Sequence, residues 1–180
     1  MKYFYVGATA EVDRQMFQAI RDQSAADLAG RGDCIICEIE LPAVEFAFDA
    51  NRAQYRSIAV LEMLSRLCPA DGWKLLAITE RDLFIPVLTF VFGQAQLDGR
   101  VAVVSLSRLR QEFYGLPADD GVLLDRARKE VLHEVGHTFG LVHCAVRSCA
   151  MSLATSVRHI DLKQAGYCEA CGKRAQREAL

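Results

Sequence analysis

The sequence predicts a mixed α/β fold, in which helices cover a mainly parallel sheet and one edge strand runs antiparallel. Three observations predict it: apolar segments alternate with helical patterns in the first half, two strand-like segments then flank a tight turn, and one long amphipathic helix follows. A length of 180 residues is typical of one domain with a real core.

The first half of the chain has the order β-α-β-α-β, which favours parallel strands. Strands are expected at residues 2–8 (KYFYVGA), 34–41 (CIICEIEL) and 74–79 (KLLAIT). Helices are expected at residues 11–29 and 50–67. Gly30 and Gly32 follow the first helix, Pro42 follows the second strand, and Pro69 follows the second helix, so each element has a stop signal.

The next segment predicts a hairpin. Residues 87–95 (VLTFVFGQA) and 100–109 (RVAVVSLSRL) are strand-like and are joined by the turn QLDG. One of these strands would then be antiparallel and near a sheet edge.

Residues 119–140 predict one long helix, capped by Asp119 or Asp120 and ended by Gly140. Its apolar stripe consists of Leu124, Ala127, Val131, Val135 and Phe139. From residue 141 onward no long periodic element is visible, and residues 173–180 (KRAQREAL) are expected to be a solvated terminus.

The segment HEVGHTFGLVH, residues 133–143, carries a metal-ligand pattern. Residues four apart on a helix share one face, so His133 and His137 can hold one ion, roughly opposite the apolar stripe and facing a cleft. Glu134 is one residue out of phase and is better placed to reach a water on the metal than the metal itself. Its predicted role is general base.

A third ligand is expected from His143. Gly140 can adopt the left-handed conformation that ends a helix, which would turn the chain so that His143 approaches the same ion. The complete pattern, His-Glu-x-x-His-x-x-Gly-x-x-His, arises by chance roughly once in a hundred thousand chains of this composition. Three neutral imidazoles leave zinc an open position for a water that ionises near neutral pH, which is chemistry that can hydrolyse an amide.

Four of the seven cysteines have the spacing of a second metal site. They are Cys144, Cys149, Cys168 and Cys171, in the pattern C-x4-C-x18-C-x2-C. Four thiolates leave no open coordination position, which suits a structural zinc; the alternative is four reduced cysteines that only pack. An odd number of cysteines without a targeting segment argues for thiols and metal rather than disulfides.

The remaining cysteines are not expected to bind metal. Residues three apart in a strand point to opposite faces, so Cys34 and Cys37 cannot easily share an ion or form a disulfide. With Cys68 they are expected to be core thiols. His159 has no partner at ligand spacing and is expected at the surface or at a helix end.

The metal motif resembles that of the metzincin metalloproteases, in which a methionine turn lies beneath the metal. The matching residues are His133, Glu134, His137, Gly140, His143 and Met151. The cysteines at 144, 149, 168 and 171 resemble one branch, the archaemetzincins, and the upstream segments FVFGQAQ and GRVAVVSLSRLR are also similar to that family.

The resemblance implies a metzincin-like zincin fold, with a twisted mixed sheet, an antiparallel edge strand and an active-site helix. It implies a single metalloprotease domain at 1–180, with an N-terminal α/β part at 1–140 and a small zinc-braced C-terminal subdomain at 141–180. It further implies two zinc ions per chain, a catalytic one held by His133, His137 and His143, and a structural one held by Cys144, Cys149, Cys168 and Cys171. The role of Met151 as the hydrophobic floor comes from the resemblance alone.

The predicted function is zinc-dependent hydrolysis of peptide bonds by a zinc-bound water that Glu134 activates. The alternative is a zinc-binding protein with little or no proteolytic activity that acts in binding or regulation, and the presence of a base at Glu134 favours the enzyme. A thiol redox protein is remote, because neither CxxC pair lies at the strand-to-helix turn that such chemistry needs. Internal cleavage and trimming of amino termini both stay open.

Charge and composition limit the partners and the location. A net charge of -2 gives no general attraction to nucleic acid or to an anionic membrane. The N-terminal apolar segment is too short for a secretion signal, and no segment approaches the roughly 18 apolar residues of a membrane span. We expect a cytoplasmic monomer without a removable pro-segment, acting on peptide or protein substrates and not on nucleic acid or membranes.

Overall fold

The computed structural model describes residues 2–28 and 34–178. Its main sheet has five strands in the order β2-β1-β5-β8-β7. The strands are β1 (Lys2–Ala8), β2 (Cys34–Glu38), β5 (Gly72–Thr79), β7 (Gly93–Ala95) and β8 (Val101–Ser105). Neighbouring strands are parallel except β7 and β8, which are antiparallel. The predicted mixed sheet with an antiparallel edge strand is therefore confirmed.

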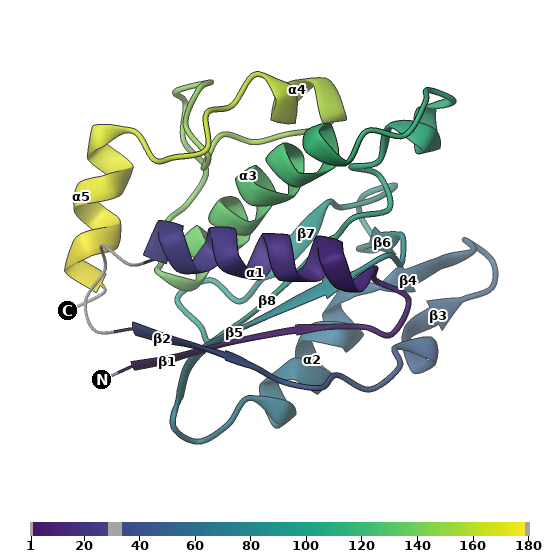
Figure 1. The fold of residues 1–180 in the computed structure, drawn as a ribbon, viewed down its shortest axis with the longest axis horizontal. Coiled ribbons are helices and arrows are strands. Elements are labelled where there is room, and N and C mark those ends of the chain that lie inside the picture. The colour runs from purple at the N-terminus through teal and green to yellow at the C-terminus, as the bar shows by residue number, and fades with distance from the viewer. Residues whose placement is uncertain (1, 29–33, 179–180) are drawn as a thin grey trace.

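Helices cover both faces of this sheet (Figure 1). Helices α1 (Arg14–Leu28) and α3 (Asp120–Thr138) pack on one face, and α2 (Ser57–Leu67) packs on the other. The short helices α4 (Val157–Asp161) and α5 (Glu169–Glu178) belong to the C-terminal part, drawn in yellow-green and yellow. None of the helices in the described ranges is both long and apolar enough to cross a bilayer.

Two hydrophobic cores form because successive side chains of a strand point to opposite faces. In β5, Leu76 and Ile78 are buried under α1 and α3, whereas Leu75 and Ala77 are buried under α2 together with Leu64. Each such aliphatic side chain contributes about 1.5–3 kcal/mol when fully buried. Because the central strands are covered on both faces, their sequences are continuously apolar rather than alternating.

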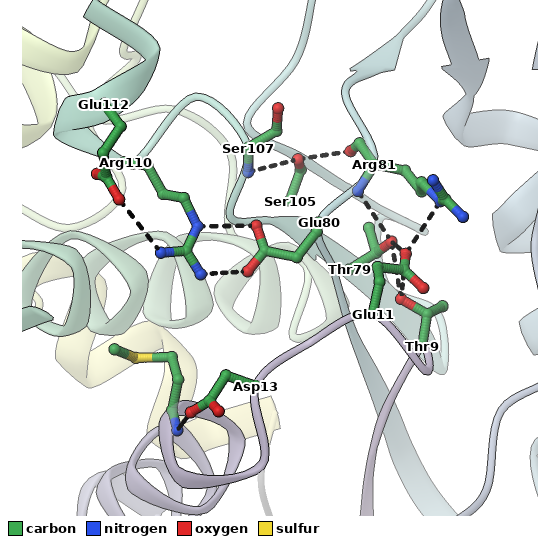
Figure 2. Close-up of polar contacts among 11 residues, drawn as sticks. Thr9, Glu11, Asp13, Thr79, Glu80, Arg81, Ser105, Ser107, Arg110 and Glu112 are labelled. Atoms are coloured by element: carbon green, nitrogen blue, oxygen red, sulfur yellow. Dashed lines mark hydrogen bonds and ion pairs between the residues drawn. The ribbon is translucent and has the colours of Figure 1, made fainter. Parts of the chain in front are cut away.

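Polar contacts join the carboxyl ends of the central strands (Figure 2). The hydroxyl of Thr9, after β1, lies 3.0 Å from the hydroxyl of Thr79 at the end of β5 and donates to Glu11 at 2.8 Å. Beyond them, Arg110 forms a two-pronged ion pair with Glu80 at 2.5 and 3.0 Å. These bonds fix the loops that follow β1, β5 and β8, and so fix the segment that leads into α3.

The predicted helix at 119–140 is α3, and its N-terminus is capped as expected. The Asp119 side chain accepts a hydrogen bond from the backbone N–H of Val122 at 2.9 Å. Of the predicted apolar stripe, Ala127, Val131, Val135 and Phe139 are buried in the core, and Leu124 is partly buried against it. The predicted helix at 11–29 is α1, and Gly30 and Gly32, its expected stop signals, lie outside the described residues.

The prediction of a helix from residue 50 was wrong at its start, because α2 begins at Ser57. Residues 54–56 instead form β4, in a second, small sheet with the order β3-β4-β6. Its strands are β3 (Phe48–Asp49), β4 (Gln54–Arg56) and β6 (Leu83–Phe84). Ala53 has a φ of 52°, which a helix does not allow, and pairing with β3 and β6 takes the place of helical hydrogen bonds.

The predicted strand at 87–95 was too long, because only residues 93–95 form β7. Two carbonyls of the preceding loop accept hydrogen bonds from side chains instead of from a neighbouring strand. The Gln54 amide donates to the Thr89 carbonyl at 3.0 Å, and the Arg52 guanidinium donates to the Leu88 carbonyl at 3.2 Å. Two 3₁₀ segments, Glu45–Ala47 and Gln111–Tyr114, were not predicted either.

In the predicted solvated terminus at 173–180, Lys173, Arg174 and Gln176 are exposed, but the segment is helical as far as residue 178, where α5 ends. Ala175 is completely buried and packs with Cys171 in a third cluster of apolar side chains. Among the α5 side chains that the structure describes, Cys171 and Ala175 are the buried ones, so the apolar periodicity was too sparse to show in the sequence. Residues 179 and 180 lie outside the described part of the chain.

Lys74 joins the sheet to the end of α3. Its ammonium donates to the carbonyls of Thr138 and Gly99, both at 2.6 Å, and so ties the helix to the turn between β7 and β8. Burial lowers the pKa of Lys74 from 10.5 to about 8.

We predict that Lys74 makes stability depend on alkaline pH. Below about pH 8, Lys74 is protonated in the folded and in the unfolded protein, and folding bears the full free-energy cost of burying its charge. From about pH 8 to 10.5, Lys74 loses its proton in the folded protein but keeps it in the unfolded chain. This cost therefore falls, and the free energy of unfolding rises, as the pH rises. Thermal melts should therefore show the melting temperature of the parent rising relative to Lys74→Met over this range. A difference that is constant or falls with pH would contradict the assignment.

Candidate metal centres

The C-terminal end of α3 turns the chain back toward the helix. Gly140 has a φ of 71°, the left-handed conformation that favours glycine. The N–H of Gly140 donates to the His137 carbonyl at 2.9 Å, and the N–H of Leu141 donates to the Gly136 carbonyl at 3.1 Å, the paired bonds of a Schellman motif. The chain beyond it, including His143, is thereby brought beside the helical face that carries His137.

The three histidines of the motif converge. A ring nitrogen from each of His133, His137 and His143 lies within 4.8 Å of the other two. The Nε2 atoms of His133 and His137 are 3.2 Å apart. A tetrahedral zinc with Zn–N bonds of about 2.0–2.1 Å would hold its nitrogens about 3.3 Å apart. The spacing therefore fits a zinc ion.

Backbone carbonyls orient two of these rings. Nδ1 of His133 lies 2.8 Å from the Ala150 carbonyl, and Nδ1 of His137 lies 2.7 Å from the Leu141 carbonyl. A carbonyl only accepts, so Nδ1 carries the proton and Nε2 keeps a free lone pair toward the cluster. Burial lowers the pKa of His133 well below its ordinary value, and it also lowers the pKa of His137 and of His143. The rings are neutral, as metal ligands must be.

The histidine cluster lines a cavity of about 560 Å³ between the loop and strand at 85–97 and the C-terminal part of the chain. Glu134 lines the same cavity and is 4% exposed. Burial first, and then the neighbouring charge of Glu130, raises the pKa of the Glu134 carboxyl well above its ordinary value. A carboxyl with a raised pKa beside a metal site is suited to general acid–base chemistry near neutral pH.

A buried ion pair adjoins this centre, and sequence analysis missed it. Lys163 is completely buried, and its ammonium donates to Glu130 at 2.9 Å. Glu130 lies one helical turn before Glu134 and lines the cavity. The spacing of four residues between Glu130 and Glu134 could have indicated that both carboxyls face the same site. Nothing in the local sequence indicated that Lys163 is the partner of Glu130.

Met151 lies directly under the motif helix and is completely buried. A Cβ built on Gly136 would lie only 2.3 Å from the Met151 sulfur, so the glycine is what lets the methionine reach the helix. The hydroxyl of Tyr167 donates to the Leu132 carbonyl at 2.6 Å on the same side. Neither Gly136 nor Tyr167 was singled out in the sequence.

The four cysteines of the second pattern also converge. The sulfur atoms of Cys144, Cys149, Cys168 and Cys171 all lie within 4.8 Å of one another. Those of Cys144 and Cys168 are 3.8 Å apart. Zn–S bonds of about 2.3 Å would place tetrahedral sulfurs about 3.8 Å apart, so this donor set fits zinc as well.

The thiols do not ionise equally. The backbone N–H of Cys171 is the main cause that lowers the pKa of Cys168 to about 7. Burial raises the pKa of Cys149 and, together with hydrogen bonding to Cys168, that of Cys171. Cys168 therefore ionises more readily than Cys149 and Cys171, and a bound cation would favour the thiolate form of these two.

The other cysteines lie elsewhere. Cys34, Cys37 and Cys68 are half-buried free thiols, which is less buried than the expected core position. Cys34 packs against the core under α1 and α3, and Cys68 against the core under α2. His159 is exposed in α4, and its Nδ1 accepts the Thr155 N–H at 3.3 Å.

Comparison with protein families gives one match, and it covers most of the chain. The sequence model of peptidase family M54 matches residues 35–177. The archaemetzincin of Methanocaldococcus jannaschii is 43% identical over 144 residues, which are 78% of each chain. The archaemetzincin of Haloquadratum walsbyi is 37% identical over 158 residues, 86% of this chain and 90% of the relative.

Solved structures agree with this family. The crystal structure of archaemetzincin from Methanopyrus kandleri superposes with a TM-score of 0.83 at 34% identity, over 99% of this chain and 94% of that one. A zinc-dependent peptidase from Methanocorpusculum labreanum gives a TM-score of 0.85 at 31% identity, over 96% and 99%. The predicted zincin-like fold is therefore confirmed.

We predict that the two donor sets bind zinc independently. His143→Ala should lose one zinc per chain and keep its melting temperature, whereas Cys168→Ser should lose the other and melt earlier, because a structural zinc stabilises by about 10 kcal/mol. Metal analysis and thermal melts measure both. Cys34→Ala and Cys37→Ala are the matched controls, and the assignment fails if either of them loses zinc or if Cys168→Ser loses none.

Proposed function

Because the chain belongs to peptidase family M54, the archaemetzincins, and is thus a zinc-dependent peptidase, we propose that its active centre consists of His133, His137, His143 and Glu134. The observation that carries this proposal is the convergence of three neutral imidazole nitrogens beside a buried carboxyl, in the wall of one cavity. The histidines would hold the catalytic zinc, and Glu134 would serve as general base.

The chemistry divides between the ion and the chain. Zinc held by His133, His137 and His143 would supply a Lewis acid for the peptide carbonyl and would lower the pKa of the attacking water. Glu134 accepts a proton from the attacking water as the water oxygen bonds to the carbonyl carbon. The C–N bond breaks as Glu134 returns that proton to the leaving nitrogen. The raised pKa of Glu134 supports both transfers, because the carboxyl can give the proton back near neutral pH.

We propose a second, structural zinc held by Cys144, Cys149, Cys168 and Cys171, which makes two zinc ions per chain. Its effect would be to brace residues 141–180 as a C-terminal subdomain beside the N-terminal part at 1–140. Met151 supports this division of roles, since it packs both against the helix at Gly136 and in the apolar cluster that contains Cys149 and Cys171. The methionine would form the apolar floor of the histidine site.

The substrate would bind as an added strand at the edge of the sheet. β7 is the last strand in the sheet order and lines the cavity. In its pairing with β8, the Phe92 carbonyl accepts from Ser105 and the Gln96 N–H donates to Val101, so the odd residues between them turn their backbone groups to the open edge. Gly93 and Ala95 therefore offer N–H and C=O groups to an extended peptide.

The cavity favours apolar substrate side chains. Both of its walls carry large apolar residues: Leu88, Phe90, Phe92 and Leu97 on the side of β7, and Val142 and Leu153 opposite. Leu97 and Leu153 are more than half exposed. Of the acidic side chains that line it, Glu130 is neutralised by Lys163 and Glu134 is the proposed base. Burial of substrate apolar surface would therefore supply most of the side-chain binding energy.

We further propose that the protein works in the cytoplasm as a monomer, without nucleic acid or membrane partners. All seven cysteines are free thiols, which suits a reducing compartment, where disulfides are rare. The net charge of -2 offers no general attraction to nucleic acid or anionic lipid.

We predict that Glu134→Ala lowers kcat for peptide hydrolysis by about 10²- to 10⁴-fold, because general-base assistance is lost. Both zinc ions should remain, since neither donor set includes Glu134. Peptide cleavage and metal content are measured on the same preparation. Glu62→Ala, which removes an exposed carboxylate from α2, is the matched control and should match the parent. Equal rates for Glu134→Ala and the parent would show that another group is the base.

We predict that peptides with leucine or phenylalanine next to the cleaved bond react faster than those with aspartate or lysine. Leu153→Asp should lower kcat/KM for the apolar peptides by about tenfold or more, because the contact with one aliphatic side chain contributes about that factor to substrate binding. Ile58→Asp, at an equally apolar exposed position on α2, should not. A peptide library without such a preference, or a complex in which a peptide analogue lies away from β7, contradicts this mode of binding.

A further inference from the structure

Gly93 lies against the side chain of Glu134. A Cβ built on Gly93 would lie 2.6 Å from Cγ and 2.7 Å from Oε1 of Glu134, closer than such atoms come in proteins. The Glu134 side chain thus occupies the space that the Cβ of any other residue at position 93 would need. We propose that Gly93 is a positioning residue of the active centre: because it has no side chain, the Glu134 carboxylate can rest against the edge strand.

Backbone conformation does not explain this glycine. Within the described residues, the glycines with a positive φ are Gly115 and Gly140. The backbone at Gly93 is one that alanine can adopt, and it lies in a strand, where glycine costs conformational entropy. What requires the glycine is therefore the close approach of Glu134 and of the Val103 carbonyl, which would lie 2.7 Å from the added Cβ.

The strand and the helix are not free to move apart. β7 pairs with β8 at Gly93, Gln94 and Ala95. The turn that follows is bound to the same helix that carries Glu134: the Asp98 N–H donates to the His137 carbonyl at 2.9 Å. Lys74 bridges the turn and the helix end a second time through two carbonyls.

An added methyl group would therefore press both on Glu134 and on the backbone of β8, and Glu134 is the partner whose displacement affects catalysis. Of the three atoms nearest to it, one belongs to the backbone of β8, which pairing holds in place, and two belong to the Glu134 side chain, which can rotate. Glu134 has the strand on one side and the cavity on the other, so it would be displaced into the cavity. A general base must lie within about 2.6–3.2 Å of the atom whose proton it takes, so a small displacement removes its function.

The metal ligands would not follow this displacement. The rings of His133 and His137 are oriented by the carbonyls of Ala150 and Leu141, which lie outside β7. The expected defect is therefore in kcat, with zinc content retained. This inference rests on the proposed role of Glu134 as the base.

The test compares zinc-loaded Gly93→Ala, Glu134→Ala, the double variant, and Gly166→Ala. Gly166 has no atom within 4 Å of an added Cβ, so it is a matched glycine control and should match the parent. Gly93→Ala should lower kcat by about 10²- to 10⁴-fold, as loss of the base does, with KM within about threefold of the parent. Metal analysis should find the zinc content of the parent.

Thermal melts of the same set separate the contact from general damage. Gly93→Ala should lower the melting temperature less in the Glu134→Ala background than in the parent, because the side chain that it displaces is absent there. Should Gly93→Ala fold only in that background, the contact is likewise supported. The proposal is overturned if kcat stays within about threefold of the parent, or if the loss of melting temperature is the same in both backgrounds. Full activity in Glu134→Ala would instead overturn the proposed function.

Discussion

The proposed active centre depends on the close packing of one helical turn, residues 133–137, on two sides. On one side, the glycine at 136 lets the sulfur of Met151 approach the helix, and the Ala150 carbonyl accepts from His133. On the other side, β7 presents Gly93 to Glu134. This close approach excludes water from His133 and Glu134, which are 6% and 4% exposed. Desolvation then lowers the pKa of His133 and raises the pKa of the Glu134 carboxyl, which suits a metal ligand and a group that exchanges protons.

Besides the two histidine–carbonyl hydrogen bonds, further polar contacts hold the C-terminal part of the chain along the same helix. Arg126 pairs with Asp161 at 2.7 Å, Glu130 pairs with Lys163 at 2.9 Å, and the Leu132 carbonyl accepts from Tyr167 at 2.6 Å. A buried ion pair adds little net stability, but removal of one partner is costly because it leaves a buried charge. The main effect of these contacts is therefore to fix the position of the C-terminal part on α3, and their net contribution to stability is small. Fixing this position aligns the Met151 turn with the histidines.

Much of this arrangement could be predicted from local sequence, because the chemistry lies in one segment. The spacing of His133 and His137 requires only helix geometry, and Gly140 is where a left-handed residue was needed. Local patterns failed where tertiary contacts decide the structure. Residues 54–56 have helical periodicity but pair with β3 and β6, and α5 is held by too few apolar residues to be recognised. The approach of Gly93 to Glu134 joins residues far apart in the sequence, so no spacing rule could reveal it.

The central proposal for this molecule is two separate metal centres, one of nitrogen and one of sulfur ligands. Anomalous scattering from crystals of the protein, recorded on either side of the zinc absorption edge, tests this most directly. The account predicts two peaks per chain, one among the Nε2 atoms of the histidine cluster and one at the centre of the four cysteine sulfurs. A single peak, or a peak at which Glu134 replaces one of the histidines as a ligand, would contradict it.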